Sequence, residues 1–407
     1  MGGVYLYDLS LLRLCKINVH SKSIKLKNMK KSINNFGRAL GVLLLCAGFV
    51  FSSCAGLWAD YVAEGFLGDE DAYGPVVDLS SSGAANCYIV SKPGIYKFKT
   101  VKGNDRSLSV GDVASASVLW ESFGTDVAPK VGDLISDVQY EDGVIVFKTP
   151  LKGLREGNAV IAAKDASGTI LWSWHIWLTD QPQGQVYYNN AGTMMDRNLG
   201  ATSATPGKVG ALGLIYQWGR KDPFLGSSSI NSDVFAKSTN IDRPEIIPWL
   251  EYRDKLDQYG VDQQYVAAHP TAWGLPTPLE MVWRTSEAAK SIYDPCPAGW
   301  RVPDGGTGGV WDKALAGRGY DPDFNKDYRG CYLSRFGADF PIWYPAAGTF
   351  RVSSIEPRSI SLYAVGSTGQ YLAATTSGNA AEGLVLSNTT FHLHTDLGAG
   401  SVRCIRE

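Results

Sequence analysis

"NAVIAAKDASGTILWSWHIWLTD" occupies residues 158–180, and the turn sequence at 164–168 separates two apolar runs. In the second run, Ile170, Trp172, Trp174 and Ile176 alternate with Leu171, Ser173, His175 and Trp177. A period of two indicates a β-strand, because successive side chains point to opposite faces of a sheet. The stretch therefore predicts two strands joined by a short turn, with the aromatic side chains in the core of a β-rich domain.

The residues before this stretch show the same organisation. "NCYIVSKPGIYKFKTVKG" (86–103) predicts two short strands around a Pro93-Gly94 turn, and "LISDVQYEDGVIVFKT" (134–149) predicts a hairpin around Asp142-Gly143. Short strands at roughly ten-residue spacing, without helices between them, favour a β-sandwich over residues 76–182. We expect His175 to be a hydrogen-bonded structural residue, because no nearby pattern supplies a catalytic partner.

The chain changes character after residue 182, where five short blocks follow in order. They are "MDRNLGA" (195–201), "GLIYQWGRKDPF" (213–224), "YDPCPAGWRVP" (293–303), "PAAG" (345–348) and "GSVRCIR" (400–406). Together they resemble the FISUMP, or major paralogous, domain of surface lipoproteins and fimbrillin-family proteins of gut Gram-negative bacteria. The resemblance covers residues 185–407, and the preceding sandwich also resembles the domain that accompanies it in such proteins.

This resemblance implies an α+β, C-type-lectin-like fold for the second domain, with a twisted sheet, two helices and a long irregular loop region. Within it, "TPLEMVWRTSEAAKSIYDPCP" predicts a helix that begins at Thr277 or Thr285, runs through Ala289 and stops before Pro295. Calcium-dependent lectins use Glu-Pro-Asn or Gln-Pro-Asp loops. Only Glu356-Pro-Arg occurs here, which argues against a calcium-dependent sugar site.

The N-terminal region contains an export signal. "MKKSINNFGRALGVLLLCAGFVFSSC" (29–54) has basic residues, an apolar run of about eleven residues and small residues before Cys54. The run is too short for a permanent membrane span. We expect residues 29–53 to be a lipoprotein signal peptide, Cys54 the lipid-attachment site, 54–75 a tether, and 1–28 an upstream extension ahead of the true start at Met29. An ordinary signal peptide with an incidental cysteine is the alternative.

The charge of the exported part excludes some partners. Residues 1–53 hold eight of the 38 Lys and Arg and one of the 40 Asp and Glu, so the remainder has a formal net charge of −9. An acidic protein is repelled by phosphate backbones and anionic lipid surfaces. We therefore expect no nucleic-acid partner, and membrane association only through the lipid anchor.

Four cysteines follow Cys54: Cys87, Cys296, Cys331 and Cys404. An exported chain can oxidise them, and four cysteines permit three complete pairings. Cys296 and Cys404 both lie inside blocks that carry the family resemblance, which implies that these two form a disulfide. Cys87 and Cys331 are then expected to be buried thiols.

Two sets of side chains are candidates for ligand contact. The tryptophans Trp273, Trp283, Trp311 and Trp343 are candidate ligand-facing aromatics, with burial in the core as the alternative. His392, His394 and Asp396 in "FHLHTD" would share one strand face and are a candidate metal site. They span about 13 Å, which is wide for one ion, so a solvated strand face is the expected alternative and no cofactor is predicted.

No motif indicates nucleophilic catalysis, so the chain is expected not to be an enzyme. We expect the protein to lie in the outer membrane and to face the cell exterior. Two functions remain for a protein in that place. It is predicted to be an adhesin or an accessory or tip subunit of a fimbria, with fimbrial subunits as partners. The alternative is a surface lipoprotein that captures a host or dietary glycan, or a matrix protein, without a pilus.

Overall fold

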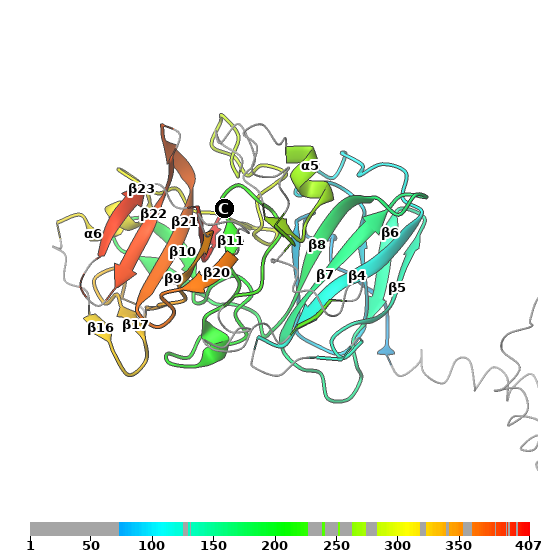
Figure 1. Ribbon diagram of the computed structural model, residues 1–407, viewed down its shortest axis with the longest axis horizontal. Coiled ribbons are helices and arrows are strands. Elements are labelled where there is room, and N and C mark those ends of the chain that lie inside the picture. Colours follow the sequence, from blue (N-terminus) through cyan, green and yellow to red (C-terminus); the bar gives the residue numbers. More distant parts are fainter. Residues whose placement is uncertain are drawn as a thin grey trace, which may run out of the picture. The chain divides into compact units, whose positions relative to one another are not determined.

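The computed structural model describes residues 73–407 except 125–128, 131, 227–237, 241–250, 253–262, 274–282, 318–322, 339–341, 353–359, 379, 388, 390, 396 and 397 (Figure 1). The predicted extension, the signal peptide, Cys54 and most of the tether lie outside the described residues. Tyr73–Glu407 is one compact unit, and the boundary predicted at 182–185 falls inside it. No helix in the described part of the chain is long and apolar enough to cross a membrane.

The N-terminal segment contains two sheets (Figure 1). One has the strand order β1 (Val77–Asp78), β3 (Ile95–Lys99), β6 (Val144–Lys148) and β5 (Ser136–Glu141). The other has the order β12 (Ser238–Asn240), β4 (Ser115–Ser122), β7 (Gly157–Lys164), β8 (Ile170–Leu178) and β2 (Cys87–Val90). The predicted β-rich, sandwich-like character is therefore present. One edge strand, β12, comes from the segment after residue 182.

Local turn chemistry explains both hairpins. Asp142 and Gly143 have φ values of 46° and 82°, which match the left-handed turn that joins paired strands β5 and β6. Between β7 and β8, the Asp165 carboxylate accepts hydrogen bonds from the backbone N–H groups of Ser167 and Thr169, both at 2.9 Å. Both predicted strand pairs are confirmed. The Pro93-Gly94 turn instead leads from β2 in one sheet to β3 in the other.

Aromatic side chains fill the space between the two sheets. Phe98 packs against Trp174 with ring centroids 5.2 Å apart, and Tyr96 stacks on Phe147 at 5.6 Å. The same buried cluster includes Val118, Ile145, Ile161, Trp172 and Ile176. These residues come from alternate positions of their strands, so the period-two pattern correctly predicted the face that enters this core.

The opposite face of β8 is also buried. Ser173, His175 and Trp177 lie on it with at most 1% exposure. Trp177 belongs to a second cluster, which it shares with Leu199, Leu214 and other residues that follow position 182. A central strand that is covered on both faces requires a nearly continuous run of buried side chains, as "ILWSWHIWL" provides.

The segment after residue 182 forms several smaller sheets. One has four strands in the order β15 (Trp300–Arg301), β25 (Ile405–Arg406), β10 (Gly192–Met195) and β9 (Gly184–Tyr187). Another has three strands in the order β21 (Thr368–Ser377), β22 (Ala380–Ser387) and β23 (Phe391–Thr395). A three-stranded sheet contains β16 (Asp323–Asn325), β17 (Gly330–Tyr332) and β18 (Trp343–Pro345). Strand pairs are formed by β11 (Tyr216–Gln217) with β24 (Ala399–Gly400), β13 (Glu251–Tyr252) with β14 (Ala272–Trp273), and β19 (Thr349–Val352) with β20 (Ile360–Tyr363).

Helices are short in the described part of this segment. They are the 3-10 turn η2 (Val209–Ala211), α5 (Gln263–Ala268) and α6 (Val310–Leu315). The helix predicted from Thr285 through Ala289 is wrong, because a tight turn forms there. The backbone N–H of Thr285 donates to the carbonyl of Ala289 at 2.8 Å, and Arg284 forms a β-bridge with Lys290. Ala288 has a φ of 62°. The alternative start at Thr277 lies outside the described residues.

Candidate functional site

The tryptophans predicted to face a ligand lie in the interior. Trp283 and Trp311 are 0% exposed and Trp343 is 2% exposed. The indole of Trp283 donates to the carbonyl of Arg220 at 3.0 Å, and that of Trp311 donates to the Tyr344 hydroxyl at 3.2 Å. These three residues are therefore core residues and not a binding platform. The side chain of Trp273 is outside the described part of the structure.

The candidate metal residues lie on or next to β23, an edge strand of its sheet. His392 is exposed, whereas the side chain of His394 and the whole of Asp396 are outside the described residues. Among the residues that the structure describes, no three His, Cys, Asp or Glu side chains are grouped to hold a metal ion. The structure therefore adds no support to a metal site here.

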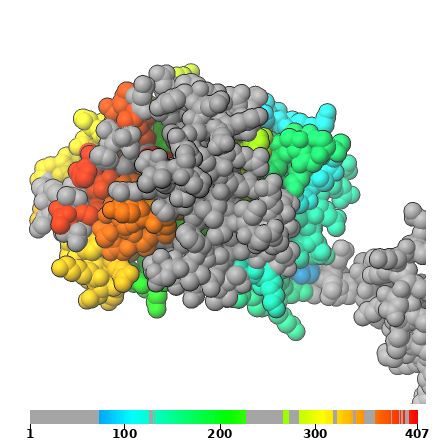
Figure 2. All heavy atoms as spheres, in the orientation of Figure 1, coloured from blue at the N-terminus to red at the C-terminus, as the bar shows by residue number. Residues whose placement is uncertain are grey.

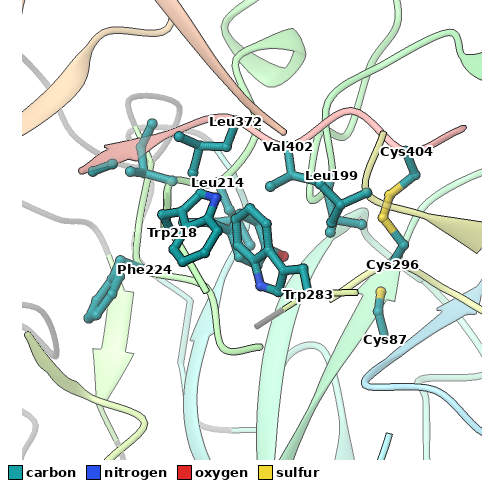
Figure 3. Close-up of a cluster of buried hydrophobic side chains, with 14 of the residues drawn as sticks. Cys87, Leu199, Leu214, Trp218, Phe224, Trp283, Cys296, Leu372, Val402 and Cys404 are labelled. Carbon is teal, nitrogen blue, oxygen red and sulfur yellow. A yellow bond between two sulfur atoms is a disulfide. The ribbon is translucent and has the colours of Figure 1, made fainter. Parts of the chain in front are cut away.

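The cysteines lie as the resemblance implied. Cys296 and Cys404 form a disulfide across a sequence separation of 108, and Cys87 and Cys331 are buried free thiols. In Figure 3, Cys87 lies beside the disulfide in the same buried cluster. Burial raises the pKa of the Cys87 thiol well above its usual range, and it raises that of Cys331 to about 12. Thiols with such pKa values stay protonated and are poor nucleophiles.

The blocks that carry the family resemblance meet in the interior. Leu199, Trp218, Cys296, Val402 and Cys404, from four different blocks, belong to one buried cluster (Figure 3). The guanidinium of buried Arg403 donates to Oδ1 of Asn198 at 3.0 Å and 3.2 Å. The blocks therefore build the fold and do not form an exposed binding surface.

Buried charges join the N-terminal strands to the second segment. The Lys221 ammonium lies 2.8 Å from both carboxylate oxygens of Asp222 and 2.6 Å from Oγ of Ser173 on β8. Burial lowers the pKa of Lys221 to about 8, an effect that the Asp222 charge opposes. A serine next to a lysine of lowered pKa has the spacing of a nucleophilic pair. Here Ser173 is 0% exposed and donates its own proton to Asp222, so the arrangement is structural.

A recess adjoins these charges. It is a small recess lined by Gly219, Arg220, Lys221, Asp222, Val266, Ala267 and Tyr293. Arg220 donates to the carbonyl of His269 at 3.0 Å and lies over the Phe224 ring at 4.9 Å. Burial lowers its pKa to about 10, opposed by the charge of Asp222. The charged side chains of the recess are therefore already engaged in contacts within the protein.

Exposed aromatic side chains occur elsewhere, on two neighbouring turns of the second segment. Tyr328, between β16 and β17, is 48% exposed, and Tyr363, at the end of β20, is 47% exposed. Val365 follows at 36% exposure. In Figure 1 the turn after β16, coloured yellow, and the turn after β20, coloured orange, lie along the same edge of the segment. We call the residues Tyr328, Arg329, Tyr363 and Val365 the tyrosine surface.

Backbone hydrogen bonds fix the two turns to each other through Ala346. The N–H of Ala346 donates to the carbonyl of Arg329 at 2.9 Å, and the Ala346 carbonyl accepts from the N–H of Gly366 at 2.8 Å. Gly366 has a φ of 78°, and a Cβ at this position would come within 2.7 Å of Cδ of Arg329. The absence of a side chain at Gly366 therefore lets the Arg329 side chain lie between the turns.

Each exposed tyrosine precedes a residue with strained backbone. Arg329 has a φ of 54° and Ala364 a φ of 59°. Such left-handed conformations cost a non-glycine residue roughly 1 kcal/mol. Strain of this kind often occurs where a function fixes the direction of a side chain.

This surface was not predicted from the sequence, where only tryptophans were expected to be ligand-facing aromatics. The available signal was the pair of Tyr-containing segments "NKDYRG" (325–330) and "SLYAVG" (361–366), in which tyrosine closely precedes glycine. Figure 2 shows yellow and orange segments close together on one face of the second segment.

No protein-family model, curated protein or solved structure matches this chain.

Proposed function

We propose that this chain is a non-enzymatic cell-surface lipoprotein, anchored through Cys54, that acts as an adhesin or as an accessory or tip subunit of a fimbria. The proposal rests on the lipoprotein-like order of residues 29–54 and on the five blocks that resemble fimbrillin-family proteins. In this proposal the N-terminal sandwich contacts other subunits, and the C-type-lectin-like domain is displayed toward the exterior of the outer membrane.

The observation that carries the proposal is the disulfide between Cys296 and Cys404. Disulfides persist in oxidising compartments and are rare in the bacterial cytosol. A covalent link across 108 positions supports a chain that works outside the cytoplasm. The buried charged side chains of Arg220, Lys221 and Asp222 are engaged in contacts within the protein, which supports a binding role over a catalytic one.

A second candidate function is glycan capture without a pilus. The tyrosine surface favours it, because aromatic faces that are exposed beside a polar group suit the alternating apolar and hydroxyl faces of a sugar. The lipid anchor is compatible with both functions, so anchoring does not distinguish them.

The first test follows the full-length chain in a Gram-negative host. Metabolic labelling with a radioactive fatty acid is expected to mark the wild-type chain and not Cys54→Ala, and external protease is expected to digest the wild-type chain on intact cells. An unlabelled or protease-protected chain contradicts surface anchoring.

The second test screens the purified full-length chain against glycans and host-matrix proteins, with and without calcium. Saturable, calcium-independent binding to a glycan supports the capture function or an adhesive lectin. Binding to no ligand, together with co-purification of fimbrial subunits, supports the structural-subunit function instead.

A further inference from the structure

The tyrosine surface contains two tyrosines that are about half exposed, and one of them, Tyr328, packs against a buried aromatic side chain. Trp343 lies under Tyr328 with ring centroids 6.3 Å apart in an edge-on arrangement, and it contacts Tyr332 at 4.7 Å. Trp343 is buried, and its indole N–H has no hydrogen-bond partner among the residues that the structure describes. The side chain of Tyr328 also lies against Gly207, where a Cβ would come within 2.7 Å of the ring. The Tyr328 ring is therefore held by contacts on more than one side.

A charged donor, Arg329, follows Tyr328 directly and reaches the turn that follows Tyr363. Arg329 is exposed, and its guanidinium makes no ion pair with any residue that the structure describes. Its side chain crosses Gly366, which is three residues after Tyr363. Guanidinium groups donate several hydrogen bonds in a fixed plane and suit hydroxyl or carboxylate oxygens.

From these contacts we infer that the tyrosine surface is a carbohydrate-binding site. The faces of Tyr328 and Tyr363 stack on the C–H faces of sugar rings, and Arg329 donates hydrogen bonds to hydroxyl or carboxylate oxygens of the same chain of sugars. The bonds through Ala346 hold both turns before a ligand arrives, so little conformational freedom is lost on binding. This inference rests on the proposed function, because it names the ligand class and location for a surface binding protein.

The test measures binding of the purified full-length chain to neutral and uronate-containing oligosaccharides by calorimetry. Tyr328→Ala and Tyr363→Ala are each expected to weaken binding at least tenfold. Tyr328→Phe keeps the aromatic face and is expected to change the affinity less than threefold. Leu108→Ala removes a comparably exposed apolar side chain from the N-terminal segment, where Leu108 is 40% exposed, and serves as the matched control.

Arg329→Gly removes the guanidinium at a position whose φ of 54° glycine adopts without strain. A loss confined to uronate-containing ligands assigns Arg329 to a carboxylate, and an equal loss with neutral ligands assigns it to hydroxyl groups. Thermal melts of each variant verify that the fold is retained.

The outcomes separate this inference from the proposed function. Glycan binding that is unchanged in folded Tyr328→Ala and Tyr363→Ala overturns the inference and leaves the surface-binding function intact. If the wild-type chain binds none of the oligosaccharides, the inference fails, whereas surface anchoring and adhesion to a protein ligand are decided by the labelling and matrix-protein experiments.

Discussion

His175 on β8 and Asn158 on β7 are joined by a side-chain hydrogen bond of 2.8 Å between Nε2 and Oδ1, in the interior of the protein. Asn158 also donates to the carbonyl of Gly200 at 2.9 Å. The hydroxyl of Tyr216 lies 3.5 Å from Nδ1 of His175. Because an amide oxygen only accepts, Nε2 carries the proton of a neutral imidazole. The network connects two strands of the N-terminal segment to a loop and to strand β11 of the second segment.

This network predicts acid sensitivity. Burial lowers the pKa of His175 from 6.5 to about 3, so the folded state binds fewer protons than the unfolded state between these values. The stabilising contribution is complete above pH 6.5 and is lost as the pH falls toward 3, at up to about 1.4 kcal/mol per pH unit. Denaturant unfolding across this range is expected to show a shallower decline for His175→Gln than for the wild type. His392→Gln, at an exposed histidine, is the control, and parallel curves for His175→Gln would contradict a buried neutral imidazole.

Asn86 makes a second connection between the segments. Its amide donates to the carbonyls of Ile292 at 2.7 Å and Asp294 at 2.9 Å, and its Oδ1 accepts from the indole of Trp172 at 2.9 Å. Asn86→Ala is expected to lower the free energy of unfolding by about 3 kcal/mol, because three partners lose a hydrogen bond and two of them, Trp172 and Asp294, are buried. Asn104→Ala, which removes one bond to the carbonyl of Lys290 from an exposed residue, is expected to cost less than about 1 kcal/mol. Equal costs would show that the three Asn86 hydrogen bonds stabilise the fold no more than the single bond of Asn104.

The pair Lys221 and Asp222 is expected to show strong coupling. Lys221→Met or Asp222→Asn alone leaves a buried charge without its partner and is expected to cost about 3–5 kcal/mol. The double variant removes both charges and is expected to cost less than the sum of the two single changes. A double-mutant cycle on urea unfolding measures the difference. Additive costs would mean that the two charges do not interact energetically.

Removal of the disulfide tests its contribution to stability. Replacing both Cys296 and Cys404 by serine is expected to lower the free energy of unfolding by roughly 4–5 kcal/mol, since the bond closes a loop of more than 100 residues. Reductant is expected to lower the melting temperature of the wild type and to leave that of the double variant unchanged. Cys331→Ser, at a buried free thiol, is the control for the loss of a buried sulfur. A wild-type melting temperature that does not change with reductant would contradict the presence of the disulfide.

Several features of the fold followed from the sequence, because they depend on neighbouring residues. The alternation in "ILWSWHIWL" placed Trp172, Trp174 and Ile176 on one face of a strand, and the Asp142-Gly143 dipeptide indicated its hairpin. Turn preference and side-chain direction are set by a few adjacent dihedral angles. The pairing of Cys296 with Cys404 followed from the family resemblance and not from spacing.

The tertiary structure decided which aromatic residues meet solvent. Trp283, Trp311 and Trp343 are buried, whereas Tyr328 and Tyr363 are exposed. Exposure depends on contacts between residues that are distant in sequence, such as that between the rings of Trp218 and Trp283, whose centroids are 5.8 Å apart. The turn at Thr285–Ala289 also formed against a helical pattern, because Trp283 and Lys290 on either side of it are fixed by buried hydrogen bonds. By itself, the sequence determined the local strand and turn pattern. Only long-range packing determined the shared core and the tyrosine surface, since burial is a property of the assembled chain.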